Sequence, residues 1–179
     1  MHRIETGNKN TEDAEDDGIY PFYVRSDKVE KISSYSFEGE AILTAGDGVG
    51  VAKVYHYAKG KMAIHQRVYK ISHFKRVLGK FLYYYIKDNF EKEVIKLSAK
   101  TTVDSLRMPM LANFPVAHPS IEGQELILDY IKKETATIET LIIKYQKQIN
   151  LMQEYRLSLI SHVVTGKIDV RDWRSVKNK

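Results

Sequence analysis

The hydrophobic and polar positions along the chain change period several times, and each change predicts a different element. Residues 19–25 form an aromatic strand-like run, residues 40–45 form a short apolar run, and residues 51–57 alternate between two faces. Further strand-like runs cover residues 62–65 and 67–71, with a turn predicted at Lys59-Gly60. From about Lys75 to Leu97 the apolar residues recur at three- and four-residue steps, which predicts an amphipathic helix. Residues 108–119 hold three of the four prolines and predict an extended connector.

A second helical pattern begins after Pro119 and is much longer than the first. From Ser120 to about Thr165 there is no proline and only one glycine, Gly123. Ser120 is a good N-cap residue, and Gly166 is well placed to end the helix. We therefore predict one helix that rises about 65 Å, which is longer than most helices of globular proteins.

The apolar residues of this long helix follow a heptad, which is the pattern of a coiled-coil seam. Thr135 and Arg156 are polar members of the same rows. Because the preceding segment needs its apolar surface for its own core, we expect the seam to face a second copy or another chain's helix. Apolar residues off the seam, such as Leu128, Leu141, Ile143 and Tyr155, favour docking of partner proteins. The predicted dimer seam consists of Ile131, Ile138, Ile142, Tyr145, Ile149, Met152, Leu159 and Val163.

Together these patterns predict an α+β protein. We expect a mixed or antiparallel β-rich domain with a packed amphipathic helix, followed by one long coiled-coil helix. The predicted boundaries are 1–119 for the first domain, 120–165 for the long helix and 166–179 for a basic C-terminal tail.

Composition narrows the class of protein. Cysteine is absent, which excludes disulfides and thiolate metal sites. There is no apolar run long enough to cross a bilayer and no apolar signal core near the N-terminus. We therefore expect a cytoplasmic protein.

The distribution of charge indicates a polyanionic partner. The net charge is +5, but residues 1–18 carry two basic and six acidic groups, so the remaining chain carries +9. Residues 48–87 contain nine Lys and Arg residues and neither Asp nor Glu. Basic groups without acidic partners repel one another, and a nucleic acid is the polyanion that most commonly neutralises them.

The stretch "TAGDGVGVAK" (44–53) superficially resembles a nucleotide-binding loop. A dinucleotide fingerprint needs a helix after the glycines, whereas the residues that follow here alternate like a strand. A P-loop would end in Gly-Lys-Ser/Thr, which is absent. Asp47-Gly48 between two apolar runs instead predicts a hairpin. The six histidines are scattered, so we predict no metal site, no cofactor-binding residue and no catalytic residue in this chain.

Several longer motifs resemble one known family. The stretches "EGEAILTAGDGVGVAKVYHYAKGKMAIHQRVYKI" (38–71) and "TGNKNTEDAEDDGIYPFYVRS" (6–26) resemble a target recognition domain of the specificity subunits of type I restriction–modification systems. "TTVDSLRMPMLANFPVAHPSIEGQELI" (101–127) and "EYRLSLISHVVTGKIDVR" (154–171) resemble the entry and the end of the spacer helix in the same subunits. Members of this family usually carry two recognition domains and two spacer helices, whereas this chain has one of each and so matches a half-subunit or a fragment.

The resemblance implies a non-catalytic role in DNA recognition. The domain would recognise a short half-site of double-stranded DNA, largely through the major groove. The spacer helix would hold a second recognition domain at a fixed distance and dock the methyltransferase (modification) subunit. Methylation and cleavage would belong to that subunit and to a restriction/translocase subunit, which would bind adenosylmethionine and ATP. A half-subunit would form a homodimer through its long helix, or pair with a second spacer helix.

Arg and Gln side chains recognise guanine and adenine edges, whereas Lys and Thr more often contact phosphates. Gln66 and Arg67 belong to "HQRV", a regular feature of the family, so they are equally explained as residues that brace the fold. Two other functions stay open from the sequence alone: a scaffold that assembles partner subunits without recognising DNA, and a coiled-coil decoy or regulator. The predicted DNA contacts are Arg25, Thr44, Lys53, His65, Gln66, Arg67, Lys70, Lys100, Thr101, Thr102 and Arg107.

Overall fold

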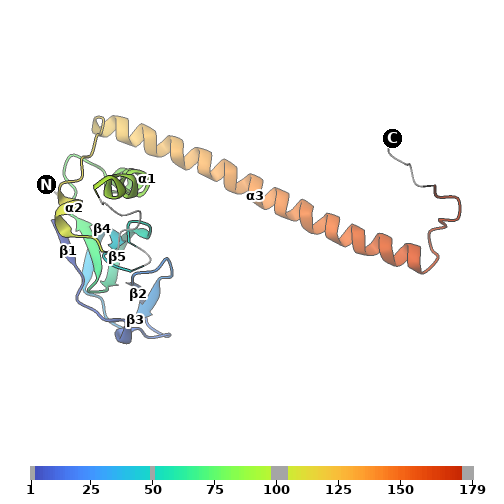
Figure 1. Cartoon of the computed structure of the whole chain (residues 1–179), viewed down its shortest axis with the longest axis horizontal. Coiled ribbons are helices and arrows are strands. Elements are labelled where there is room, and N and C mark those ends of the chain that lie inside the picture. The colour runs from blue at the N-terminus through green and yellow to red at the C-terminus, as the bar shows by residue number, and fades with distance from the viewer. Residues whose placement is uncertain (1–2, 49–50, 98–104, 175–179) are drawn as a thin grey trace. The chain divides into compact units, whose positions relative to one another are not determined.

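The computed structural model of the chain describes residues 3–48, 51–97 and 105–174 (Figure 1). A six-stranded mixed sheet and a long helix near the C-terminus confirm the predicted α+β class. The chain divides into two compact units, Met1–Leu128 and Asp129–Lys179. The first unit therefore extends beyond the predicted boundary at residue 119, because the first turns of the long helix pack within it.

The sheet of the first unit has the order β1-β6-β4-β5-β2-β3. Its neighbouring strands are antiparallel with one exception, the parallel pair β2 and β5. A short 3-10 helix, Thr11–Asp13, follows the first strand. The strands are β1 (Arg3–Thr6), β2 (Tyr20–Tyr23), β3 (Glu30–Ile32), β4 (Phe37–Ala45), β5 (Tyr55–Ile64) and β6 (Val68–Ser72).

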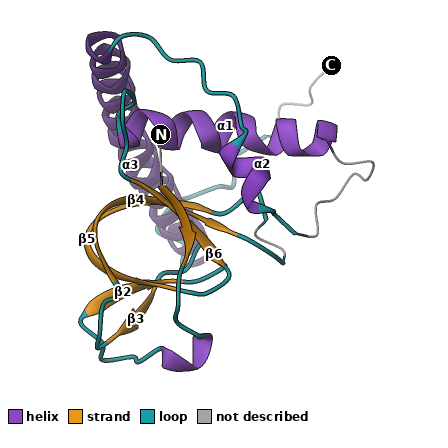
Figure 2. Cartoon of the chain, turned by 90° about the vertical axis from the view of Figure 1, so that its left-hand side faces the viewer, coloured by secondary structure: helices purple, strands orange, loops and turns teal. Residues whose placement is uncertain are grey.

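Strand β4 lies at the centre of the sheet, and its last five residues, 41–45, are each at most 1% exposed. Because side chains alternate along a strand, β4 contributes to an apolar cluster on each face of the sheet. Ile42 packs with helix α1 (Gly79–Leu97) and with Leu111 of helix α2 (Met108–Ala112), while Leu43 packs with Met62 of β5. Figure 2 shows α1 and α2 on one side of the strands.

The predicted turn at Lys59-Gly60 is wrong, because β5 runs without interruption through both residues. Gly60 faces Gly39 of β4 in the register, and both have positive φ, +101° and +145°. This glycine pair allows an unusual backbone geometry inside the ladder without ending it. The predicted strand at 51–57 is also shortened, since residues 51–53 form a turn and β5 begins at Tyr55.

Two helix predictions need correction. Helix α1 begins at Gly79 and not near Lys75, because Arg76 has a left-handed φ of 64°, which a right-handed helix cannot contain. The supposed connector at 108–119 begins with helix α2. Pro109 does not prevent this helix, since it lies in the first turn, where no backbone N–H is needed.

The long helix, α3, spans Ile121–Val164 and confirms the prediction made from residues 120–165. Ser120 Oγ accepts a hydrogen bond of 3.2 Å from the Gly123 amide, so it caps the first turn as expected. Gly166 has a left-handed φ of 74°, which suits the residue that ends a helix. No helix in the described part of the chain is long and apolar enough to cross a membrane.

Within the second unit, most of the predicted seam is exposed. Ile138, Ile142, Tyr145 and Met152 are each more than half exposed, and Ile149 and Leu159 are 48% and 40% exposed. The off-seam residues Ile143 and Tyr155 are also exposed, at 71% and 69%. Leu128 differs, because it is partly buried and packs against the core of the first unit.

Candidate nucleic-acid interface

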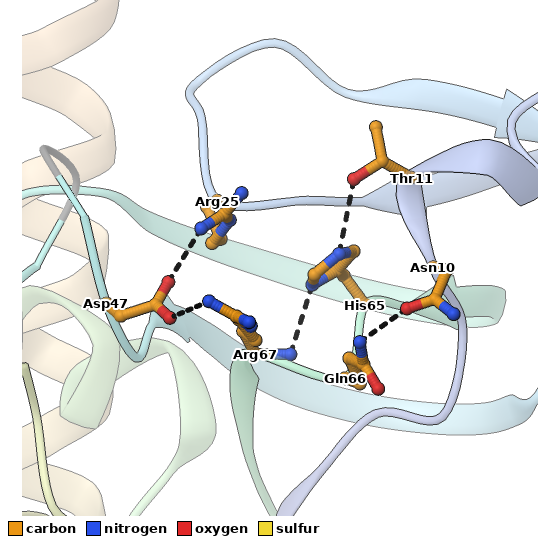
Figure 3. A network of polar contacts seen from close by, with 7 residues as sticks. All are labelled: Asn10, Thr11, Arg25, Asp47, His65, Gln66 and Arg67. Atoms are coloured by element: carbon orange, nitrogen blue, oxygen red, sulfur yellow. Dashed lines mark hydrogen bonds and ion pairs between the residues drawn. The ribbon is translucent and has the colours of Figure 1, made fainter.

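Three loops of the first unit meet around the short turn between β5 and β6, residues 65–67. Because β2 and β5 are parallel and adjacent, their carboxyl ends lie together, which brings Arg25 beside the turn after β5. Strand β4 runs antiparallel to β6, so the end of β4 lies beside the start of β6. The residues that follow β2, β4 and β5 therefore converge although they are far apart in sequence. Figure 3 shows the polar side chains that meet here.

An Arg–Asp–Arg cluster lies at this meeting point. Arg25 Nη1 donates to Asp47 Oδ1 at 2.9 Å, and Arg67 Nη1 donates to Asp47 Oδ2 at 2.8 Å. The side chains of Arg25 and Arg67 are 43% and 57% exposed, and that of Asp47 is 27% exposed. Burial acts to raise the pKa of Asp47, but the hydrogen bonds from both arginines outweigh it and hold the pKa below its ordinary value. The carboxylate is therefore ionised at neutral pH, and the three groups together carry one net positive charge.

His65 supports the cluster from inside the fold. Its ring is 4% exposed, and its Nδ1 accepts a 3.0 Å hydrogen bond from the Arg67 amide. Since Nδ1 accepts, the proton of the neutral ring is on Nε2, which donates to Thr11 Oγ1 at 3.2 Å. Burial, followed by the charges of Arg25 and Arg67, lowers the pKa of His65, so this neutral form is favoured.

Gln66 ties the same turn to the polar N-terminal segment. Its side-chain Nε2 donates to Asn10 Oδ1, and its backbone N–H donates to the Lys9 carbonyl at 2.8 Å. Gln66 is exposed, and its side chain points toward Asn10, whereas the side chain of the neighbouring Arg67 points toward Asp47 (Figure 3). Gln66 therefore both braces the turn and presents an amide group at the surface.

The structure brings only some of the predicted DNA contacts to this surface. Arg25, Gln66 and Arg67 lie together, and Lys53 is exposed in the same β4–β5 connection that holds Asp47. Arg107 is exposed next to Leu106, whose amide donates to the Gly46 carbonyl at 2.7 Å. Lys100, Thr101 and Thr102 lie outside the described residues.

Three other candidates do not present a free group to solvent. Thr44 is 0% exposed because it belongs to the central strand, and His65 is buried as described above. The side chain of Lys70 is 12% exposed, with its Nζ 3.1 Å from Glu5 Oε2 and 4.0 Å from the centre of the Phe37 ring. These positions correct the surface role that the sequence suggested for them.

The acid-free block, residues 48–87, is also less isolated in the fold than in the sequence. Lys59, Arg67 and Lys70 form ion pairs with Glu40, Asp47 and Glu5, which come from outside the block. Other cations of the block are placed elsewhere, on β5, before α1 and on α1. The charge run is therefore partly neutralised in the fold by acidic residues from outside it.

Sequence reasoning assigned Asp47 only a role in a turn. Asp47 is the last acidic residue before the acid-free block, and that position was the available signal. Its two arginine partners come from residues 25 and 67, which only the strand order brings together. Within the described residues, no group of three or more His, Asp or Glu side chains is arranged to hold a metal ion.

The first unit is β-rich with a cationic loop surface, and a long helix with exposed apolar residues follows, which is the arrangement expected of a DNA-specificity subunit from the resemblance of the sequence. The sequence profile of the family described as type I restriction modification DNA specificity domain matches residues 3–151. The chain belongs to this family.

The comparisons with individual proteins agree with this assignment. The chain is 27% identical over 176 residues to the type I restriction enzyme EcoDI specificity subunit of Escherichia coli, covering 98% of the chain and 38% of that protein. Its fold is similar to a type I restriction–modification S subunit from M. genitalium, with a TM-score of 0.62 and 19% identity over 89% of the chain and 43% of that one. It is also similar to the HsdS subunit from Thermoanaerobacter tengcongensis, with a TM-score of 0.53 and 14% identity over 78% of the chain and 36% of that subunit. The chain thus spans less than half the length of these relatives.

Proposed function

We propose that this chain recognises a DNA half-site for a type I restriction–modification complex and leaves catalysis to partner subunits. Membership of the DNA specificity family supports this proposal at the level of the class. At the level of individual residues, the proposal rests on the Arg25–Asp47–Arg67 cluster and on Gln66, which is exposed in the same turn as Arg67. Arginine forms paired hydrogen bonds with the O6 and N7 atoms of guanine, and glutamine does so with adenine.

The long helix would position the partners. A seam of exposed apolar residues along α3 supports pairing with a second spacer helix, either of another copy or of another chain. The exposed off-seam residues Ile143 and Tyr155 support docking of the methyltransferase and restriction subunits. In this arrangement two recognition domains would lie on one duplex and recognise two half-sites.

Adenosylmethionine and ATP would bind to the partner subunits. The glycine stretch of this chain is followed by strand β5, and not by a helix whose N-terminus faces a phosphate. This observation argues against a dinucleotide-binding loop or a P-loop in this stretch.

The test compares DNA affinity for charge variants of the chain, assembled with its methyltransferase subunit. Loss of a base-contacting arginine costs roughly 1–3 kcal/mol. We therefore expect Arg67→Ala to weaken binding to a selected site by about 5- to 150-fold. Lys53→Glu should weaken binding to every duplex and reduce the salt dependence, because lysine contacts phosphates.

Lys80→Ala is the matched control, since it removes one positive charge from an exposed position in α1. It should change affinity little. Equal and small effects of Arg67→Ala and Lys80→Ala would contradict the proposed interface.

A further inference from the structure

The two arginines of the cluster are held as a pair by a single carboxylate. Each guanidinium donates to a different oxygen of Asp47 through its Nη1 atom alone. A guanidinium has five N–H donors, so most donors of each arginine stay available. Among the described residues, neither side chain makes a further hydrogen bond, and both are about half exposed. The pair is therefore fixed at one edge and open at the other (Figure 3).

Asp47 is itself held in place by the backbone around it. The Gly46 amide donates to the Arg67 carbonyl at 2.8 Å, and Asp47 forms a β-bridge with Ser105. A side chain at position 46 would place its Cβ 2.9 Å from the Arg67 carbonyl oxygen, so glycine permits this close approach. The loop that contains Asp47 and the turn that contains Arg67 are thus joined by backbone contacts.

This arrangement reduces the free energy that ligand binding would need to order the side chains of Arg25 and Arg67. Two guanidiniums brought together without an anion would repel, and each arginine loses about 2 kcal/mol of rotamer entropy when it is fixed. Asp47 offsets the repulsion and fixes both rotamers before any ligand arrives. Preorganisation of this kind favours geometric selection of a ligand.

The charge of Asp47 also distinguishes between two possible DNA ligands. A phosphate carries a full negative charge and would be repelled by the carboxylate between the arginines. A guanine edge presents two acceptors without a net charge, so the same carboxylate opposes it much less. A cluster that only gripped the DNA backbone would therefore lose part of its attraction for phosphate to the acidic residue at its centre.

We propose that Asp47 is a specificity-determining positioning residue, which aligns Arg25 and Arg67 for the guanine edges of the half-site. This inference rests on the proposed function and adds to it the base that the cluster selects. Asp47 holds the two arginines and makes no contact with DNA in this arrangement. The half-site should therefore contain G·C pairs at the positions that the two arginines reach.

The variant Asp47→Asn distinguishes the alignment of the two arginines from the effect of net charge on DNA binding. The variant gains one positive charge, so charge alone predicts tighter binding to any duplex. The asparagine keeps one acceptor oxygen and turns donors toward one arginine, so the pair loses its alignment. We expect the ratio of affinities for the selected site and for random DNA to fall at least ten-fold, while affinity for random DNA rises.

Glu38→Gln is the matched control, because it makes the same change of charge at an exposed residue of β4. It should leave the ratio unchanged. Arg25→Lys provides a second test that keeps the charge and loses the planar fork. It should reduce discrimination at one G·C position while affinity for random DNA stays unchanged.

The experiment uses the chain with its methyltransferase subunit and duplexes selected from a random pool. If the unaltered complex selects no sequence, the proposed function itself fails. If it selects a site and Asp47→Asn keeps the same affinity ratio, the inference is overturned while the proposed function stands. A selected site without G·C pairs would also overturn the inference. If Asp47→Asn tightens binding to specific and random DNA equally, the cluster is a phosphate clamp and the inference is overturned. If the variant weakens binding to both equally, Asp47 is merely structural and the inference is also overturned.

Discussion

Replacing Gln124 with leucine should destabilise the packing of the first turns of α3 within the first unit. Gln124 is 0% exposed, and its Oε1 accepts a 2.8 Å hydrogen bond from the Leu78 amide just before α1. Its Nε2 donates to the carbonyls of Arg76 and Pro119 at 3.3 and 3.1 Å. Every hydrogen-bonding atom of this buried amide group is therefore used within the unit.

The expected change in the free energy of unfolding follows from the polar groups that leucine would leave without hydrogen-bond partners. A buried donor or acceptor that loses its partner costs roughly 1–3 kcal/mol. One amide and two carbonyls are affected, and the additional apolar burial of leucine offsets part of the loss. We expect Gln124→Leu to lower the free energy of unfolding by about 2–4 kcal/mol.

The assay is urea denaturation followed through the tyrosine signal in near-ultraviolet circular dichroism. Hydrogen exchange at the Leu78 amide gives a local measure, because this amide should exchange faster once its acceptor is removed. Gln146→Leu is the control, since Gln146 is exposed on the same helix and donates only to Asn150 at 3.1 Å. Equal stability of the two variants, with unchanged exchange at Leu78, would refute the reasoning.

Three further predictions concern protonation, a buried hydroxyl and the helix seam. Because burial and the neighbouring arginines lower the pKa of His65, the unfolded chain should take up the proton first as pH falls below about 6.5, so stability should decrease there. His65→Gln should lose this decrease between pH 7 and 5.5, and an unaltered pH profile would contradict the assignment. The hydroxyl of Tyr55 is buried with the Thr44 hydroxyl as a polar neighbour, and neither makes a hydrogen bond of good geometry among the described residues, so Tyr55→Phe should be neutral or stabilising in thermal unfolding. A loss above roughly 1 kcal/mol would reveal a partner for that hydroxyl. Ile142→Asp should give monomers in sedimentation, whereas the off-seam variant Thr140→Asp should not, and identical profiles would reject the seam.

The long helix could be predicted from the sequence because its signals are local. A cap at Ser120, a glycine at 166 and a run without proline act through neighbouring residues alone, and the structure confirms both ends. Helix α1 was predicted in part, since its apolar period was clear but the left-handed residue that delays its start was not.

The site was harder to predict because tertiary pairing creates it. Charge and residue type indicated Arg25 and Arg67, but only the parallel pairing of β2 with β5 brings them together. The same reasoning placed Thr44 at the surface, although it belongs to the central strand and is fully buried. Burial depends on strand order, which this chain's local pattern does not specify.

In the proposed function, this chain supplies the sequence preference of a larger complex. The most direct test is selection of bound duplexes from a random DNA pool by the methyltransferase subunit, with and without the chain. We expect one enriched motif that appears only when the chain is present. Binding without enrichment, or the same enrichment in both samples, would contradict it.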